Sequence, residues 1–195
     1  MKEIVLASTN QGKLKELRKL LSDIEIKVLS LNDFPEAPEV IEDGITFEEN
    51  ALKKAMQIAK YTKKLAIADD SGLEVLALGG APGVESSRFA KNDKERVDKL
   101  LKVMENKRNR EAKFICAIAI ANPGNEVKVV RGEVEGVITE APKGNCGFGY
   151  DPVFVAEGYT KTFAEISMEE KNKISHRAKA LIKAKKVLEE KLLEV

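Results

Sequence analysis

Short apolar runs typical of buried strands alternate with segments of helical periodicity at the beginning of this chain. Residues 4–7 are apolar and lead into the polar segment 8–12, after which leucines recur at helical spacing. A second strand is expected over residues 26–31, and a third over 65–68 that can continue over 73–78. Strands joined through helices favour parallel pairing, so this part of the chain predicts βα units.

Helix starts are predicted from capping residues followed by apolar stripes. Thr46 with Glu49 three residues later has the pattern of a capping box, and Ser167 with Glu170 repeats it. The helices are expected to begin near Lys13, Thr46, Asp93, Ser167 and Ser175.

The middle of the chain favours antiparallel strands. Asn122 to Asn125 form a turn between two strand-like runs, which predicts a hairpin. Strands are expected at 112–121, 127–130, 133–139 and 153–155. Hairpins together with βα units predict an α/β fold with a mixed sheet. With no repeat or linker, residues 1–195 are expected to form one domain.

Composition excludes several classes of protein. Hydrophobic residues at 43% and charged residues at 33% are typical of a globular domain with a core, and the net charge of +1 gives no general attraction for nucleic acid or membranes. One histidine and two cysteines cannot form a zinc cage, and a structural disulfide between Cys116 and Cys146 is not expected. With no secretion signal or membrane span in the sequence, we expect a cytoplasmic protein with a small-molecule partner.

The segment Ser8 to Lys13 lies between a predicted strand and a predicted helix. A helix N-terminus exposes N–H groups, and hydroxyls, an amide, Gly12 and Lys13 add donors and charge that suit a phosphate. The spacing is not that of a Walker A loop. The alternative is an ordinary polar turn.

Two adjacent carboxylates, Asp69 and Asp70, follow a buried strand and precede Ser71 and Gly72. Neighbouring side chains of a strand point to opposite faces, so both reach one site only if the chain bends, which Gly72 would allow. Carboxylates at a buried strand end require pairing or a metal, so they predict a functional site. The alternative is a turn in which the aspartates accept hydrogen bonds from nearby N–H groups.

The segment 144–152 places three glycines around Phe148 and Tyr150. An aromatic ring beside open backbone can stack on a flat base; alternatively, both rings join the core. His176 and Arg177 follow at a helix start, where they form either a donor cluster or part of the structure.

Five segments together resemble, in order and over almost the whole chain, the inosine triphosphate pyrophosphatase family. They are LASTNQGK, TFEENALKKA, ADDSGLEV with LGGAPGVESSRFA, GFGYDPVF and EEKNKISHRAKAL. These enzymes hydrolyse non-standard purine nucleoside triphosphates (ITP, dITP and XTP) to the monophosphate and pyrophosphate. The resemblance implies an elongated two-lobed α/β fold with a long mixed central sheet, a cleft between the lobes, dependence on Mg²⁺ and a homodimer.

The resemblance also implies roles for single residues. It gives the catalytic water to Asp70, which would hold Mg²⁺ together with Glu42, and it makes Asp69 a supporting acid. The implied substrate contacts are Ser8, Thr9, Asn10, Gln11, Gly12, Lys13, Lys54, Ser71, Phe148, Gly149, Tyr150, Asp151, Lys171, His176 and Arg177. The chain departs from the family at Thr9, where many relatives have glycine, and at Cys146.

Two alternatives remain open at this point. One is a Maf-like pyrophosphatase that acts on other modified nucleotides, although GFGYDP and SHRAKAL favour the first family. The other is a nucleotide-sensing module without turnover, for which Asp70 and a metal would matter little.

Overall fold

The structure is a computed structural model that describes residues 2–193. Its strands are β1 (Lys2–Leu6), β2 (Ile26–Ser30), β3 (Leu65–Val75), β4 (Glu111–Ala121), β5 (Val127–Ile138) and β6 (Phe154–Ala156). Its helices are α1 (Gln11–Leu20), α2 (Phe47–Thr62), α3 (Asp93–Val103), α4 (Met168–Ile174) and α5 (His176–Leu193). The strands are hydrogen-bonded in the order β2-β1-β3-β4-β5-β6. Because β1 pairs in parallel with β2 and β3 whereas β5 and β6 are antiparallel, the predicted mixed α/β sheet is confirmed.

The chain divides into two compact units. The first unit consists of residues 1–70, 117–131 and 180–195, and the second of residues 71–116 and 132–179. Strands β3, β4 and β5 and helix α5 supply residues to both units. The expected elongation, the cleft between lobes and the single domain over residues 1–195 stay predictions.

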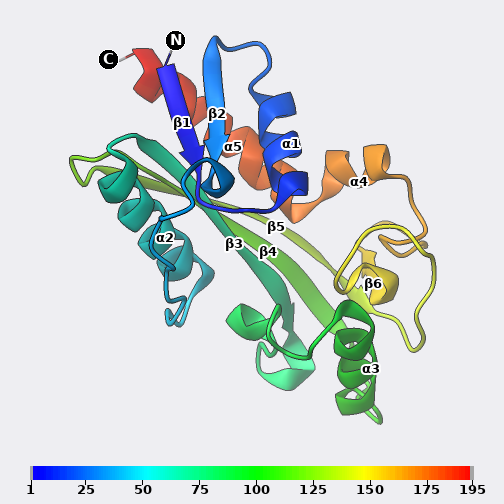
Figure 1. Ribbon diagram of the computed structural model, residues 1–195. Coiled ribbons are helices and arrows are strands. Elements are labelled where there is room, and N and C mark those ends of the chain that lie inside the picture. The colour runs from blue at the N-terminus through cyan, green and yellow to red at the C-terminus, as the bar shows by residue number, and fades with distance from the viewer. Residues whose placement is uncertain (1, 194–195) are drawn as a thin grey trace. The chain divides into compact units, whose positions relative to one another are not determined.

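In the first unit, two βα crossovers place α1 and α2 on opposite faces of the parallel strands. The crossover from β1 to β2 moves outward along the sheet, and the crossover from β2 to β3 returns past β1 in the opposite direction. Since both are expected to be right-handed, their helices must cover opposite faces. Figure 1 shows α1 and α2 on the two sides of β1 and β3 in this unit.

The strand β3 differs from the prediction. Asp69 to Gly72 were expected to end a strand or to bend it, but they lie inside one continuous strand from Leu65 to Val75. The strand continues because Leu73 and Val75 are fully buried in the core of the second unit. Similarly, the two strands expected at 127–130 and 133–139 are one strand, β5.

The second unit has an aromatic core. The ring of Phe114 meets that of Phe154 edge-on at 4.6 Å between centroids, and Phe154 lies 5.1 Å from Phe163. Such pairs add to the free energy gained from burying the rings. Helix α3 packs Val97 and Leu100 against this core.

The predicted helix starts agree with the structure to within a few residues. Thr46 Oγ1 accepts from the N–H of Glu49, and Ser167 Oγ accepts from that of Glu170, as the capping pattern predicts. The cap of α3 is Asn92 and not Asp93, which is the first residue of the helix. Among the described residues, no helix combines the length and the apolar character that crossing a membrane requires.

Candidate active site

The connections of the first unit indicate where a ligand binds. In open parallel sheets, ligands bind beside the carboxyl ends of strands where the connections leave in opposite directions. Here β2 and β3 lie on either side of β1, so the carboxyl end of β1 is such a point. The polar segment 8–10 follows β1, and Asp69 and Asp70 lie just beyond Ile67, which pairs with the last residue of β1, Leu6.

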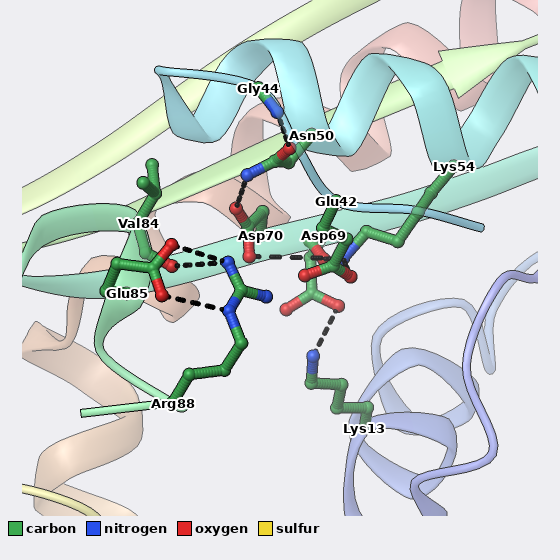
Figure 2. A network of polar contacts seen from close by, with 10 residues as sticks. All are labelled: Lys13, Glu42, Gly44, Asn50, Lys54, Asp69, Asp70, Val84, Glu85 and Arg88. Carbon is green, nitrogen blue, oxygen red and sulfur yellow. Dashed lines mark hydrogen bonds and ion pairs between the residues drawn. The ribbon is translucent and has the colours of Figure 1, made fainter. Parts of the chain in front are cut away.

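The two aspartates have different partners because side chains alternate along β3. The Nζ atom of Lys13, on α1, lies 2.9 Å from Asp69 Oδ1. Asp70 accepts on Oδ2 from the side-chain amide of Asn50, on α2, at 3.1 Å. Figure 2 shows both contacts. The side chain of Asp69 therefore contacts α1, and that of Asp70 contacts α2.

The ammonium of Lys54 lies among oxygen atoms from three residues. Its Nζ atom is 2.7 Å from Glu42 Oε1, donates to the carbonyl oxygen of Asp69 at 2.7 Å and lies 3.9 Å from Asp70 Oδ1 (Figure 2). We call Glu42, Lys54, Asp69 and Asp70 the carboxylate cluster.

Asn50 is a site residue that the sequence analysis missed. It is fully buried, accepts from the N–H of Gly44 at 2.8 Å and donates to Asp70. A Cβ atom on Gly44 would lie 2.7 Å from the side-chain oxygen of Asn50, so the glycine allows this close approach. A polar amide inside the apolar stripe of α2, four residues before Lys54, was the available signal.

The carboxylate cluster gathers carboxylates and ammonium groups in close contact. With Lys13 included, Glu42, Asp69 and Asp70 face two ammonium groups. Burial raises the pKa of Asp70 above its usual value, and Glu42 and Asp69 raise it further, whereas Lys54 and Asn50 oppose the rise. Carboxylate oxygens gathered in this way are the hard donors that a divalent cation such as Mg²⁺ prefers.

The segment Ser8 to Lys13 caps α1. Asn10 Oδ1 accepts from the N–H of Lys13, and Ser8 Oγ accepts from the N–H of Asn10, both at 3.1 Å. Thr9 keeps a negative φ and its carbonyl accepts from the side-chain amide of Gln11 at 3.4 Å. The side chain of Asn10 therefore caps α1. It stays a prediction that a phosphate is contacted by Ser8, Thr9, Asn10, Gln11, Gly12 and Lys13.

In the second unit, the two rings of the glycine-rich segment have different environments. Phe148 is 62% exposed, so its ring does not join the core. Tyr150 is 4% exposed and donates from its hydroxyl to the carbonyl of Ser86 at 3.0 Å. Burial raises the pKa of Tyr150. The Tyr150 ring therefore belongs to the core, whereas the Phe148 ring is available for stacking; that Tyr150 contacts substrate stays a prediction.

Lys171 and Asp151 form a buried ion pair that contacts Phe148. Lys171 contacts Asp151, and both side chains are almost completely buried. Lys171 Nζ also lies 4.7 Å from the centroid of the Phe148 ring, and Asp151 Oδ2 accepts from the N–H of Phe148 at 2.8 Å. Burial raises the pKa of Asp151, and the Lys171 ammonium opposes this rise. Lys171 and Asp151 therefore support the loop from inside.

The other predicted residues of the second unit are partly buried. The imidazole of His176 stacks on Phe114 at 4.7 Å between centroids, and Arg177 follows it on α5. Ser71 lies inside β3. Figure 2 also draws Arg88, which the sequence analysis did not single out and which forms two 3.0 Å contacts with Glu85 of the same unit. That the residues of the two units form one site stays a prediction.

Comparison with known proteins identifies the family. A model of the Ham1 family matches residues 4–187. The chain belongs to the Ham1 family. Two solved Ham1 proteins have the same fold: that of Coxiella burnetii, with a TM-score of 0.93 and 45% identity over 97% of this chain and 100% of its own, and that of Staphylococcus aureus, with 0.91 and 42% over the same shares.

Curated relatives of this Ham1 chain carry a functional name. The dITP/XTP pyrophosphatase of Bacillus licheniformis is 52% identical, over 97% of this chain and 100% of the relative. The dITP/XTP pyrophosphatase of Bacillus subtilis is 48% identical, over 97% of this chain and 98% of the relative. The family resemblance inferred from the five sequence segments is thereby confirmed.

Proposed function

We propose that this Ham1 protein hydrolyses non-standard purine nucleoside triphosphates (ITP, dITP and XTP) to the nucleoside monophosphate and pyrophosphate. The observation that carries the proposal is the carboxylate cluster beside the carboxyl end of β1, where Asp70 is held by Asn50 and lies near Lys54. The names of the curated relatives support the substrate class.

In this proposal Asp70 orients the attacking water and accepts its proton. A positioned carboxylate does so because its hydrogen bonds fix its direction, and Asn50 supplies one such bond. Lys13 and the N–H groups at the start of α1 hold the triphosphate. Phe148 stacks on the purine, with His176 and Arg177 as donors to the base.

The residues of the carboxylate cluster fit Mg²⁺. Glu42 and Asp70 would hold it. Bound there, it would neutralise charge on the phosphates. No group of three or more His, Cys, Asp or Glu side chains within residues 2–193 is arranged to hold a metal alone. This agrees with the usual binding of Mg²⁺ by one or two carboxylates together with substrate phosphates.

Base selectivity tests the proposal. Hypoxanthine and xanthine have an acceptor oxygen at C6, whereas adenine has an amino donor there, which would leave a buried donor of the protein unpaired. Guanine shares the C6 oxygen, so its rejection requires that its C2 amino group find no acceptor or no room. We expect kcat/KM for ITP, dITP and XTP to exceed that for GTP by at least about a hundredfold, and that for ATP by more. Comparable values for GTP and ITP would contradict the proposed substrate class.

The same measurements separate the alternatives. A Maf-like enzyme would favour other modified nucleotides over ITP and XTP. A sensing module would bind ITP without forming product, and the Asp70→Asn variant would bind as well as the wild type.

Assembly and location complete the proposal. We infer a homodimer, which sedimentation of the purified protein tests. We also infer a cytoplasmic protein, since Cys116 is buried in β4 whereas Cys146 is exposed, settings that do not favour a structural disulfide between them.

A further inference from the structure

The first residue of α3 contacts the loop that carries Phe148. Asp93 Oδ2 accepts from the N–H of Gly149 at 2.8 Å, although 56 residues separate the two in the sequence. Both residues lie in the second unit. The contact joins a regular helix to the exposed tip of a loop.

Beyond the contacts of Phe148 with Lys171 and Asp151, the tip of the loop has few means of holding its shape. Gly147 and Gly149 flank Phe148 with φ of +79° and +61°, values that glycine adopts easily and other residues rarely do. Neither glycine has a side chain to pack, and the Phe148 ring is mostly exposed. The base of the turn is fixed, since Asp151 accepts from Phe148 N–H and donates from its own N–H to the Phe148 carbonyl. Asp93 holds the following residue from another element.

Asp93 is itself held in direction by Arg96. The guanidinium of Arg96 contacts Asp93 Oδ1, one turn along α3, which leaves Oδ2 for Gly149. Arg96 Nε is buried and has no hydrogen-bond partner among the residues that the structure describes. The ion pair therefore offsets part of the cost of burying the Nε atom, and it fixes the carboxylate that receives the loop.

We propose that Asp93 is a positioning residue: through the N–H of Gly149 it holds Phe148 in the orientation in which the ring stacks on the purine. The inference rests on the proposed function, because it takes Phe148 as the contact to the base. The proposal gives Asp93 no contact with the phosphates, so its effect is expected to be confined to recognition of the nucleoside.

Steady-state kinetics give the first test. In Asp93→Ala we expect the KM for ITP to rise about three- to tenfold, the effect of losing one hydrogen bond to a charged group, with kcat within about twofold of wild type. Inorganic tripolyphosphate lacks a base, so its inhibition constant against ITP hydrolysis is expected to stay unchanged. Equal losses for both ligands would overturn the proposal.

Two control variants separate positioning from helix stability. Arg96→Met removes the ion pair but leaves the Asp93 carboxylate beside Gly149, so it is expected to lower the melting temperature as Asp93→Ala does while raising KM less. Asp98→Ala removes an exposed acid from the same helix and is expected to change neither quantity. A KM in Asp98→Ala that rises as much as that in Asp93→Ala would overturn the proposal.

A fluorescence measurement tests the loop without nucleotide. The chain has no tryptophan, so Phe148→Trp introduces a single probe at the exposed position. Adding Asp93→Ala is expected to increase the fast component of its anisotropy decay, and adding Asp98→Ala is not. An unchanged decay would overturn the proposal whatever the enzyme hydrolyses, whereas failure of the wild type to hydrolyse ITP would refute the proposed function alone.

Discussion

Asp69 and Asp70 are adjacent in β3, yet helices on opposite faces of the first-unit sheet hold them: Lys13 of α1 contacts Asp69 at 2.9 Å, and Asn50 of α2 donates to Asp70 at 3.1 Å. The alternation of a strand therefore separates two neighbouring carboxylates into two environments. Only Asp70 is held by α2 through its side chain, whereas Asp69 faces the helix that begins with the predicted phosphate loop.

The two aspartates are expected to respond differently to the same substitution. Asp70→Asn removes the proposed base and metal ligand and is expected to lower kcat about a hundredfold or more, with the fold intact. Asp69→Asn keeps the shape and loses the ion pair with Lys13, so we expect mainly a change in KM. Steady-state kinetics at saturating Mg²⁺ compare them. An Asp70→Asn rate within a few-fold of wild type would show that Asp70 is not the base.

Asn50 is expected to matter for both stability and rate. Asn50→Ala leaves the partly buried N–H of Gly44 without its acceptor and Asp70 without its amide donor, which costs about 1 to 3 kcal/mol in free energy of unfolding. We expect kcat to fall about tenfold as Asp70 loses its direction. Gln57→Ala, at an exposed position of the same helix, is the control. Urea unfolding and kcat are measured together, and a stability loss with unchanged kcat would limit Asn50 to a structural role.

Lys54 is expected to compete with a divalent cation for the carboxylate cluster. Its ammonium contacts the same oxygens that would hold the metal, so Lys54→Met leaves their negative charge less compensated. We expect the nucleotide-free variant to bind Mn²⁺ about tenfold more tightly, while KM for ITP rises if Lys54 also holds phosphate. Lys53→Met, which removes an exposed pair with Asp43, is the matched control. Electron paramagnetic resonance of free Mn²⁺ gives the affinity, and weaker binding by Lys54→Met would refute the competition.

The order of elements and most helix starts follow from the sequence because capping and periodicity are local. Thr46 and Ser167 cap their helices through side chains three residues from their partners. Ser71 and Gly72 have the composition of a turn, yet the burial of Leu73 and Val75 in the second unit keeps them in a strand. The secondary-structure preferences of Ser71 and Gly72 alone do not predict this, because the burial of their neighbours is a tertiary effect.

In the candidate site, too, the residues predicted from local sequence differ from those that only tertiary contacts reveal. Asp70 and Lys13 were predicted from their places beside strand and helix ends. Asn50 and Asp93 were not, because their partners lie 20 and 56 residues away in the sequence. Contacts between residues so far apart in the sequence depend on how the elements are arranged in space, and only the structure shows which single residues meet.

The buried pair of Lys171 and Asp151 predicts a pH-dependent effect on stability. Lys171→Met leaves Asp151 buried without the Lys171 ammonium that opposes the effect of burial. In the folded variant, the pKa of Asp151 therefore rises further above its value in the unfolded chain. The folded variant then favours protonated Asp151, so its stability falls as pH rises above the unfolded-state pKa, until the folded-state pKa is passed.

Relative to wild type, we therefore expect Lys171→Met to lose about 3 kcal/mol near pH 7.5 and less near pH 5. Urea unfolding of both proteins at the two pH values measures the difference, and Lys173→Met, on the exposed face of α4, is the control. A loss that is equal at both pH values would contradict a buried, charged Asp151.

Identification of the products of ITP hydrolysis tests the central proposal most directly. Purified protein is incubated with ITP and Mg²⁺, and the products are resolved by anion-exchange chromatography and ³¹P NMR, with Asp70→Asn as the inactive control. We predict IMP and pyrophosphate in equal amounts and no accumulation of IDP. Release of inorganic phosphate with IDP, or turnover by Asp70→Asn at the wild-type rate, would contradict the account.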